Sequence, residues 1–208
     1  LSFFFSSSVF LSSLSVSFYT ILPTLSLGSG SDLSQAGYYS IADKIRAASQ
    51  SAMQPAFSAV FPRISGLFHV NYSNAIKLLK SSIVATSLIS GLISYTVYLC
   101  SERIVALVVG HELKEAALVL KHMAPLILII SMSTVASQQI LLPNQKVGQF
   151  NNGLFIGGAV ALALIIALGS EQDAVTMSLV LVTVEVVVCS AMWVPAALYL
   201  RRRFKKLR

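Results

Sequence analysis

The sequence predicts an all-α, polytopic membrane protein in which six transmembrane helices form one bundle, and three observations support this fold class. Of the 208 residues, 55% are hydrophobic and only 11% are charged, whereas soluble domains average about 25% charged residues. The mean hydropathy is +0.77. The apolar residues form runs near the roughly 20 residues that one helical crossing of the bilayer needs. The chain is therefore predicted to consist of membrane spans, without room for a soluble domain beside them.

Six apolar runs, separated by polar or Pro- and Gly-containing segments, give the predicted spans. Their bounds are residues 3–27, 36–62, 80–100, 117–141, 150–168 and 174–200. They form a single domain, residues 1–200, followed by a basic tail of residues 201–208. The tail holds six of the fifteen Lys and Arg residues, which predicts a cytoplasmic C-terminus by the positive-inside rule. Specific binding of the tail to anionic lipid headgroups is the alternative.

The six-span topology also agrees with the other basic residues. Residues 63–80 and 142–149 are predicted to lie on the same side as the tail. This side carries ten basic residues and the opposite side carries five. The bias again predicts that the tail side is cytoplasmic.

The first span, residues 3–27, is apolar but crowded with serines. Serine is tolerated in membrane helices because its hydroxyl can bond a carbonyl one turn back or reach a neighbouring helix. Helix packing is our preferred explanation, and a polar cavity is the alternative. The chain begins at Leu1 within an apolar run, without the basic segment of a signal peptide, so we expect it to be part of a longer protein.

The second span, residues 36–62, carries Asp43, Lys44 and Arg46 in a run that otherwise resembles a membrane helix. Charges at this depth are costly unless they face a bundle interior or a water-filled cavity. At about 100° per residue, the first and third of these share one helix face with Gln50 and Gln54. This polar stripe is a candidate substrate or ion pathway, with a simple interfacial pair between Asp43 and Arg46 as the alternative.

Prolines and short apolar pieces set the expected boundaries after this stripe. Pro55 predicts a kink in the second span, and Pro62 marks the point where that helix should leave the membrane. An amphipathic loop is expected over residues 63–80. After the third span, the apolar piece IVALVVG within residues 101–115 is too short to cross the bilayer and suggests a separate interfacial helix.

The last three spans add a proline, a small-residue motif and a carboxylate. Pro125 interrupts the fourth span, and Gly153 and Gly157 in the fifth have the GxxxG spacing that permits close helix packing. Glu185 lies near the middle of the sixth and has no charged partner within a turn of its own helix. It must therefore be protonated, face water or pair with a residue from another helix.

The sequence lacks the usual marks of catalysis, metal binding or nucleic-acid binding. His111 and Glu112 begin a zinc-protease motif, but Glu115 occupies the place of the second histidine. Cys100 and Cys189 lack metal-ligand spacing and are interpreted as packing residues. The net charge of +7 is concentrated in the tail rather than spread over a nucleic-acid-binding face. We therefore expect no catalytic residues, no metal, no cofactor and no nucleic-acid partner.

A protonatable carboxylate in mid-membrane suits a proton-coupled transporter, and a basic polar helix face suits an anionic substrate. Two regions of the chain, each made up of two runs, then resemble a known family. GYYSIADKI and QPAFSAVFPRIS are similar to the eighth-helix region of the Wzx-type oligosaccharide flippases, whose superfamily includes the MATE multidrug exporters. GHELKEAALVLKHMAPLILIISM, followed by QQILLPNQK, resembles a later part of the same family.

The resemblance implies a transporter of two pseudo-symmetric helical bundles around a central cavity, with this chain as the C-terminal bundle and a missing N-terminal bundle as its partner. Such a protein would flip undecaprenyl-diphosphate-linked oligosaccharides across the bacterial cytoplasmic membrane by alternating access, driven by a proton or sodium gradient, for surface polysaccharide synthesis. Lys44 and Arg46 would attract the anionic diphosphate or sugar, and Asp43 or Glu185 would couple to cations.

Two other functions remain open at this point. A MATE-type multidrug exporter normally needs a more acidic cavity for cationic substrates, whereas the second span is cationic on balance. A membrane polysaccharide polymerase or ligase should show a long outward loop with catalytic residues, and the sequence has none.

Overall fold

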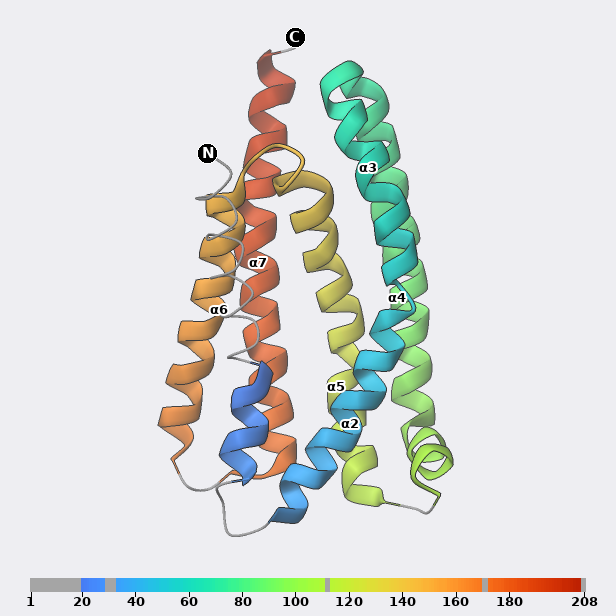
Figure 1. The fold of residues 1–208 in the computed structure, drawn as a ribbon, viewed down its shortest axis with the longest axis vertical. Helices are drawn as coiled ribbons and strands as arrows, with labels where there is room; N and C mark the ends of the chain where they lie inside the picture. Colours follow the sequence, from blue (N-terminus) through green and yellow to red (C-terminus); the bar gives the residue numbers. More distant parts are fainter. Residues whose placement is uncertain (1–19, 29–32, 111–112, 170–171, 207–208) are drawn as a thin grey trace.

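The computed structural model describes residues 20–28, 33–110, 113–169 and 172–206, and every regular element within them is helical (Figure 1). Four helical segments are long and apolar enough to cross a membrane: α4 (Tyr72–Val109), α5 (Lys114–Thr134) with its π-helical extension η1 (Val135–Leu141), α6 (Val147–Leu168) and α7 (Ala174–Lys206). They run alternately in opposite directions along the bundle (Figure 1). The all-α prediction is thus confirmed for the described residues, but the count of six spans is not.

Two predicted spans are absent from these four. Most of the first, residues 3–19, lies outside the described residues, and residues 20–28 are helical. The second, predicted as one kinked helix, is wrong in form, because it divides into α2 (Leu33–Ser51) and α3 (Gln54–Val70). Pro55 explains the break: it has no N–H and its ring clashes with a carbonyl one turn back, whereas the first turn of α3 needs no such donor.

The predicted loop of residues 63–80 is also wrong. α3 continues past Pro62 to Val70, and α4 begins at Tyr72. Asn71 alone makes the turn: its N–H donates to the Leu67 carbonyl at 2.8 Å, and its side-chain oxygen accepts from the Asn74 N–H at 3.1 Å. One residue therefore ends α3 and caps α4, so few residues are left outside the helices.

The predicted interfacial helix after the third span is part of α4. Neither Pro nor Gly occurs between Cys100 and Val109, so nothing interrupts the helical hydrogen bonds. Gly110 ends the helix in the left-handed region, with φ of 84°, a conformation that glycine adopts at little cost. The short length of the apolar piece suggested an independent helix, whereas no residue within it interrupts the backbone hydrogen bonds of α4.

α5 is the central helix of the fold, packed against α2, α4 and α7. Pro125 lies within α5 without ending it, and ten of the 21 residues of this helix are buried. The helix widens into η1, beside which the Trp193 indole N–H of α7 donates to the Met132 carbonyl at 3.0 Å. Gly153 of α6 faces α7, where a Cβ would lie 3.2 Å from Met192 Cγ, so this glycine permits the close packing expected from the GxxxG spacing.

Contacts between segments distant in sequence define the two ends of the bundle. At one end, the Arg203 guanidinium of α7 lies over the ring of Tyr72, 5.3 Å from its centre, and the Tyr199 hydroxyl donates to Asn144 Oδ1 at 2.7 Å. The α3–α4 turn, the α5–α6 loop and the basic end of α7 therefore meet. At the other end, Gln35 Oε1 of α2 accepts from the Ala174 N–H at 3.0 Å, which ties α2 to the start of α7.

Candidate functional site

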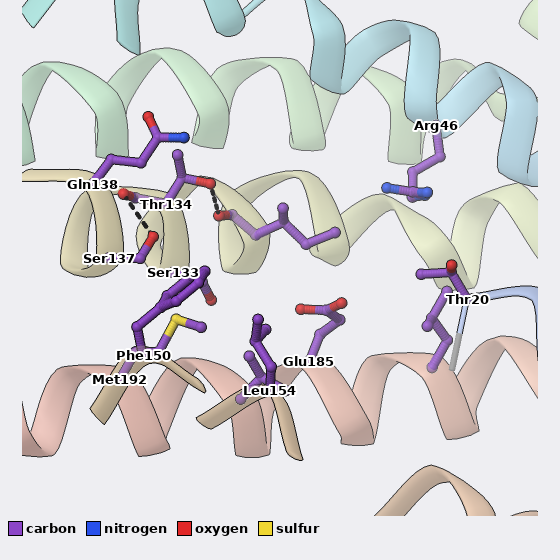
Figure 2. Close-up of a pocket in the computed structure, with 13 residues that line it drawn as sticks. Thr20, Arg46, Ser133, Thr134, Ser137, Gln138, Phe150, Leu154, Glu185 and Met192 are labelled. Carbon is purple, nitrogen blue, oxygen red and sulfur yellow. Dashed lines mark hydrogen bonds between the residues drawn. The ribbon is translucent and has the colours of Figure 1, made fainter. Parts of the chain in front are cut away.

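A cavity of about 380 Å³ lies among α2, α5, η1, α6 and α7, with Thr20 at its edge. Its walls mix apolar side chains with hydroxyls and an amide, and two charged residues line it: Arg46 and Glu185. Figure 2 shows the guanidinium entering from α2 and the carboxylate rising from α7 into the same space. The structure thus brings together two of the residues singled out from the sequence.

Arg46 is held in place by its neighbour one turn earlier. Its Nη2 and Nε both donate to Asp43 Oδ1, at 2.6 and 2.9 Å. The Arg46 side chain is 12% exposed and that of Asp43 is 34% exposed, so the cation is the more deeply placed partner. The local ion pair expected as the alternative does form, but it does not exclude a pathway role, because Arg46 also lines the cavity.

Glu185 is the buried acid of the site. It lies on α7 in the middle of an apolar helix and is 6% exposed. A carboxylate at such a position is stabilised by hydrogen bonds, by a cation or by protonation. Glu185 lines the cavity from α7, and the Arg46 cation enters the same cavity from α2.

A row of polar side chains from α5 and η1 forms another wall of the cavity. Ser133, Thr134, Ser137 and Gln138 line it along one stretch of helix, as seen in Figure 2. The three hydroxyls donate to carbonyls of their own helix, at 3.1, 2.8 and 3.1 Å. Their oxygens therefore retain lone pairs that can accept from a ligand hydroxyl or coordinate a hard cation.

These hydroxyls were not among the site residues predicted from the sequence. Their spacing, at positions 133, 134 and 137, places them on one face of a helix, and this was the available signal. This signal was hard to recognise because serine and threonine also occur in four of the five other predicted spans, all but residues 150–168.

The remaining predicted site residues lie elsewhere. Gln50 is buried against α5, where its Nε2 donates to Ser131 Oγ at 3.0 Å. Gln54 is exposed at the start of α3, beyond the helix break. Lys44 is exposed and lines a separate groove between α2 and α4. The structure therefore divides the predicted stripe among three environments: the cavity, the contact with α5 and the exposed start of α3. A role of these residues in transport stays a prediction.

The site suits ion binding and charge exchange better than covalent chemistry. Within residues 20–28, 33–110, 113–169 and 172–206, no group of three or more His, Cys, Asp or Glu side chains could hold a metal ion. One carboxylate beside several hydroxyl oxygens suits a proton or a hard monovalent cation. Arg46 adds a positive charge that can attract an anion or compete with a cation for Glu185.

Known proteins from two bacteria are similar in sequence to this chain. The chain is 30% identical over 184 residues to an Escherichia coli (strain K12) protein named "Putative O-antigen transporter", and the alignment covers 88% of this chain and 44% of that protein. The chain is thus similar in sequence to a protein named as an O-antigen transporter. A Shigella dysenteriae protein of the same name is 30% identical over 124 residues, which are 59% of this chain and 30% of that protein.

These relatives confirm the resemblance to the Wzx-type flippases. The chain spans less than half of the length of either O-antigen transporter relative. No family model matches the chain, and no solved structure does. Together with the four long apolar helices, the relatives identify a multi-pass membrane protein.

Proposed function

We propose that this chain is the C-terminal bundle of a flippase that moves undecaprenyl-diphosphate-linked oligosaccharide repeat units across the cytoplasmic membrane by alternating access. The observation that carries the proposal is the cavity in which Arg46 and Glu185 face each other among apolar helices. The relatives are named as O-antigen transporters, which supports a surface-polysaccharide substrate. A transporter needs such a polar interior, because a sugar or a charge cannot cross hydrocarbon unaided.

The two charges suggest how an ion gradient drives the cycle. An ionised Glu185 attracts the Arg46 guanidinium across the cavity, whereas a protonated or cation-bound Glu185 leaves the guanidinium with Asp43. Arg46 and Glu185 lie on α2 and α7, so each exchange of partner favours a different relative position of these helices. A change of this kind, coupled to an ion on one side of the membrane, is the bistable element that alternating access requires.

The hydroxyl groups that line the cavity suggest that it also binds the coupling ion in this cycle. The oxygens of Ser133, Thr134 and Ser137 line the same space as Glu185. They complete an oxygen-rich site for a sodium ion or for the water that carries a proton. Arg46 supplies the positive potential that favours an anionic diphosphate at the neighbouring substrate path.

The proposal is tested by deleting the complete gene from its host and following both surface polysaccharide and lipid-linked repeat units. We expect surface polysaccharide to disappear and repeat units to accumulate on the cytoplasmic leaflet, with reversal by a plasmid-borne copy. Accumulation on the outer leaflet would identify a polymerase or ligase instead. Normal polysaccharide with increased drug sensitivity would identify a multidrug exporter.

A further inference from the structure

A second pocket lies on the outside of the bundle, between α2 and the last turn of α4. It has a volume of about 320 Å³ and walls that are almost wholly apolar: Ile41, Ile45, Ala48, Val108 and Val109. We call it the α2–α4 groove. Its polar lining groups are the Lys44 ammonium and the Ser49 hydroxyl, and that hydroxyl donates to the Ile45 carbonyl at 2.9 Å. The groove therefore offers an apolar channel with one positive charge.

The charge of Lys44 has no acidic partner in the described part of the chain. The neighbouring carboxylate, Asp43, binds Arg46 instead, and no described Asp or Glu is among the residues lining the groove. An ammonium that is exposed beside apolar walls favours a ligand that provides both an anion and a hydrocarbon surface. A small soluble anion would use only the first of these.

The level of the groove in the bundle indicates the same kind of ligand. Glu102 and Arg103, two turns before the end of α4, are exposed charges, from which we infer that this end of the helix lies at the lipid headgroups rather than in the hydrocarbon core. Leu107 and Val108 are nevertheless 87% and 61% exposed. Exposed apolar side chains beside charges at that level are typical of a surface that lipid covers.

We propose that the α2–α4 groove binds an anionic phospholipid, with the phosphate at Lys44 and the upper part of one acyl chain between Ile45, Ala48 and Val108. This site is separate from the cavity of Arg46 and Glu185, and it does not depend on the transported substrate. Lys44 thus anchors lipid, whereas Arg46, two residues later, serves the interior.

The test uses the full-length protein reconstituted into nanodiscs of phosphatidylethanolamine and phosphatidylglycerol, then released gently for native mass spectrometry. Lys44→Gln removes the charge and should lower the phosphatidylglycerol retained by about fivefold, as expected for one lysine near a headgroup. Ala48→Trp fills the groove and should lower it to a similar extent. Lys121→Gln, at an exposed lysine of α5 away from the groove, should leave it unchanged.

Three results would overturn the assignment. Unchanged phosphatidylglycerol in both groove variants would show that the groove holds no lipid of this class. An equal loss of phosphatidylethanolamine and phosphatidylglycerol in Lys44→Gln would show that the lysine does not select an anion. Crosslinking from Val108→Cys to a protein segment rather than to lipid would show that another helix or a second copy fills the groove.

Discussion

At the scale of single residues, the site combines one cation, Arg46, with two acids, one of which Arg46 already binds. Asp43 holds Arg46 through one of its carboxylate oxygens, Oδ1, so the guanidinium retains a donor, Nη1, that this pair does not use. Glu185 lies on the other wall of the same cavity. A change in the charge of Glu185 would therefore change the electrostatic potential at this guanidinium, because both groups line one cavity.

Glu185→Gln should abolish the dependence of transport on the ion gradient while the protein still inserts. Glutamine keeps the size and hydrogen-bonding capacity of the side chain but cannot titrate. Transport would be measured with an imposed pH or sodium gradient, and Glu102→Gln, at an exposed acid of α4, is the matched control. A Glu185→Gln protein with normal, gradient-dependent transport would rule out the coupling role.

Arg46→Ala should lower transport by tenfold or more, since one lost charge-assisted interaction in a low-dielectric site costs roughly 1.5–3 kcal/mol. The amount of inserted protein, measured by immunoblot, should not change. Arg103→Ala removes an exposed arginine outside the cavity and serves as the control. Transport that survives Arg46→Ala would mean that Asp43 and Arg46 form only a local ion pair.

The contacts of the candidate site could be predicted from the sequence only where the residues lie on the same helix. Helical periodicity placed Asp43 and Arg46 on one face, and these two do meet. The same periodicity failed for Gln54, because the break before Pro55 places it on another helix. The partner of Gln50 is Ser131, 81 residues away, and no local pattern specifies a contact that only tertiary packing creates.

At the scale of helices, the boundaries depend on caps more than on hydropathy. Hydropathy placed the last three helices well, because their apolar runs end at Pro143, Gly169 and the basic tail. It failed around Asn71 and Gly110, where polar segments are helical and only a cap ends the helix. Charge and polarity indicate the depth of a residue in the membrane, whereas backbone hydrogen bonding determines where the helix ends.

Asp173 provides a test of such a cap. Its Oδ1 accepts from the Thr176 N–H at 2.8 Å at the start of α7. Hydrogen bonding from the Thr176 side chain first, and from its backbone N–H second, lowers the pKa of Asp173 below its ordinary value. Because the pKa is lower in the folded protein than in the unfolded chain, the stabilisation is present above the ordinary value and is lost as pH falls through the folded value.

Asp173→Ala should therefore cost about 1 kcal/mol at pH 7, seen as a lower melting temperature in detergent. The difference from the unmodified protein should shrink in acid. Asp173→Asn, which keeps an acceptor but cannot titrate, should retain most of the stability and show no such pH dependence. Equal melting temperatures for all three proteins at pH 7 would show that the cap contributes nothing.

Pro55→Ala tests whether the break between α2 and α3 serves the transport cycle. Alanine restores the N–H and removes the ring clash, so the two helices can join into one. Spin labels at Ala47 and Ser58, both exposed on either side of the break, should then approach the separation of a continuous helix, about 1.5 Å per residue. Transport should fall if the break acts as a hinge, and full transport with a joined helix would show that it does not.

At the scale of the whole molecule, composition was enough for the fold class but not for the arrangement. An apolar chain with few charges can satisfy its backbone within a membrane only as helices or a closed barrel, and the length of its apolar runs favours helices. Composition does not determine which helix lies at the centre of the bundle. α5 is central because its faces contact α2, α4 and α7, although its hydropathy is not exceptional and lies between those of α4 and α7.

The arrangement of the bundle ends leads to a prediction of topology. The α3–α4 turn, the α5–α6 loop and the end of α7 meet around Tyr72, Asn144 and Arg203, so all three must lie on one side of the membrane. The excess of basic residues there predicts the cytoplasmic side. Single cysteines at Ser73 and Arg202 should then be protected from a membrane-impermeant thiol reagent in intact cells, whereas one at Glu115, at the opposite end, should be labelled.

The experiment needs a background in which Cys100 and Cys189, both free thiols, are replaced by serine, with activity checked before labelling. Permeabilised cells should label all three positions, which shows that protection came from the membrane and not from burial. Because the α3–α4 turn and the end of α7 are in contact, Ser73→Cys and Arg202→Cys must behave alike whichever way the protein is inserted. Opposite labelling of these two would contradict the packing of the bundle, whereas labelling of both from outside would contradict only the predicted orientation.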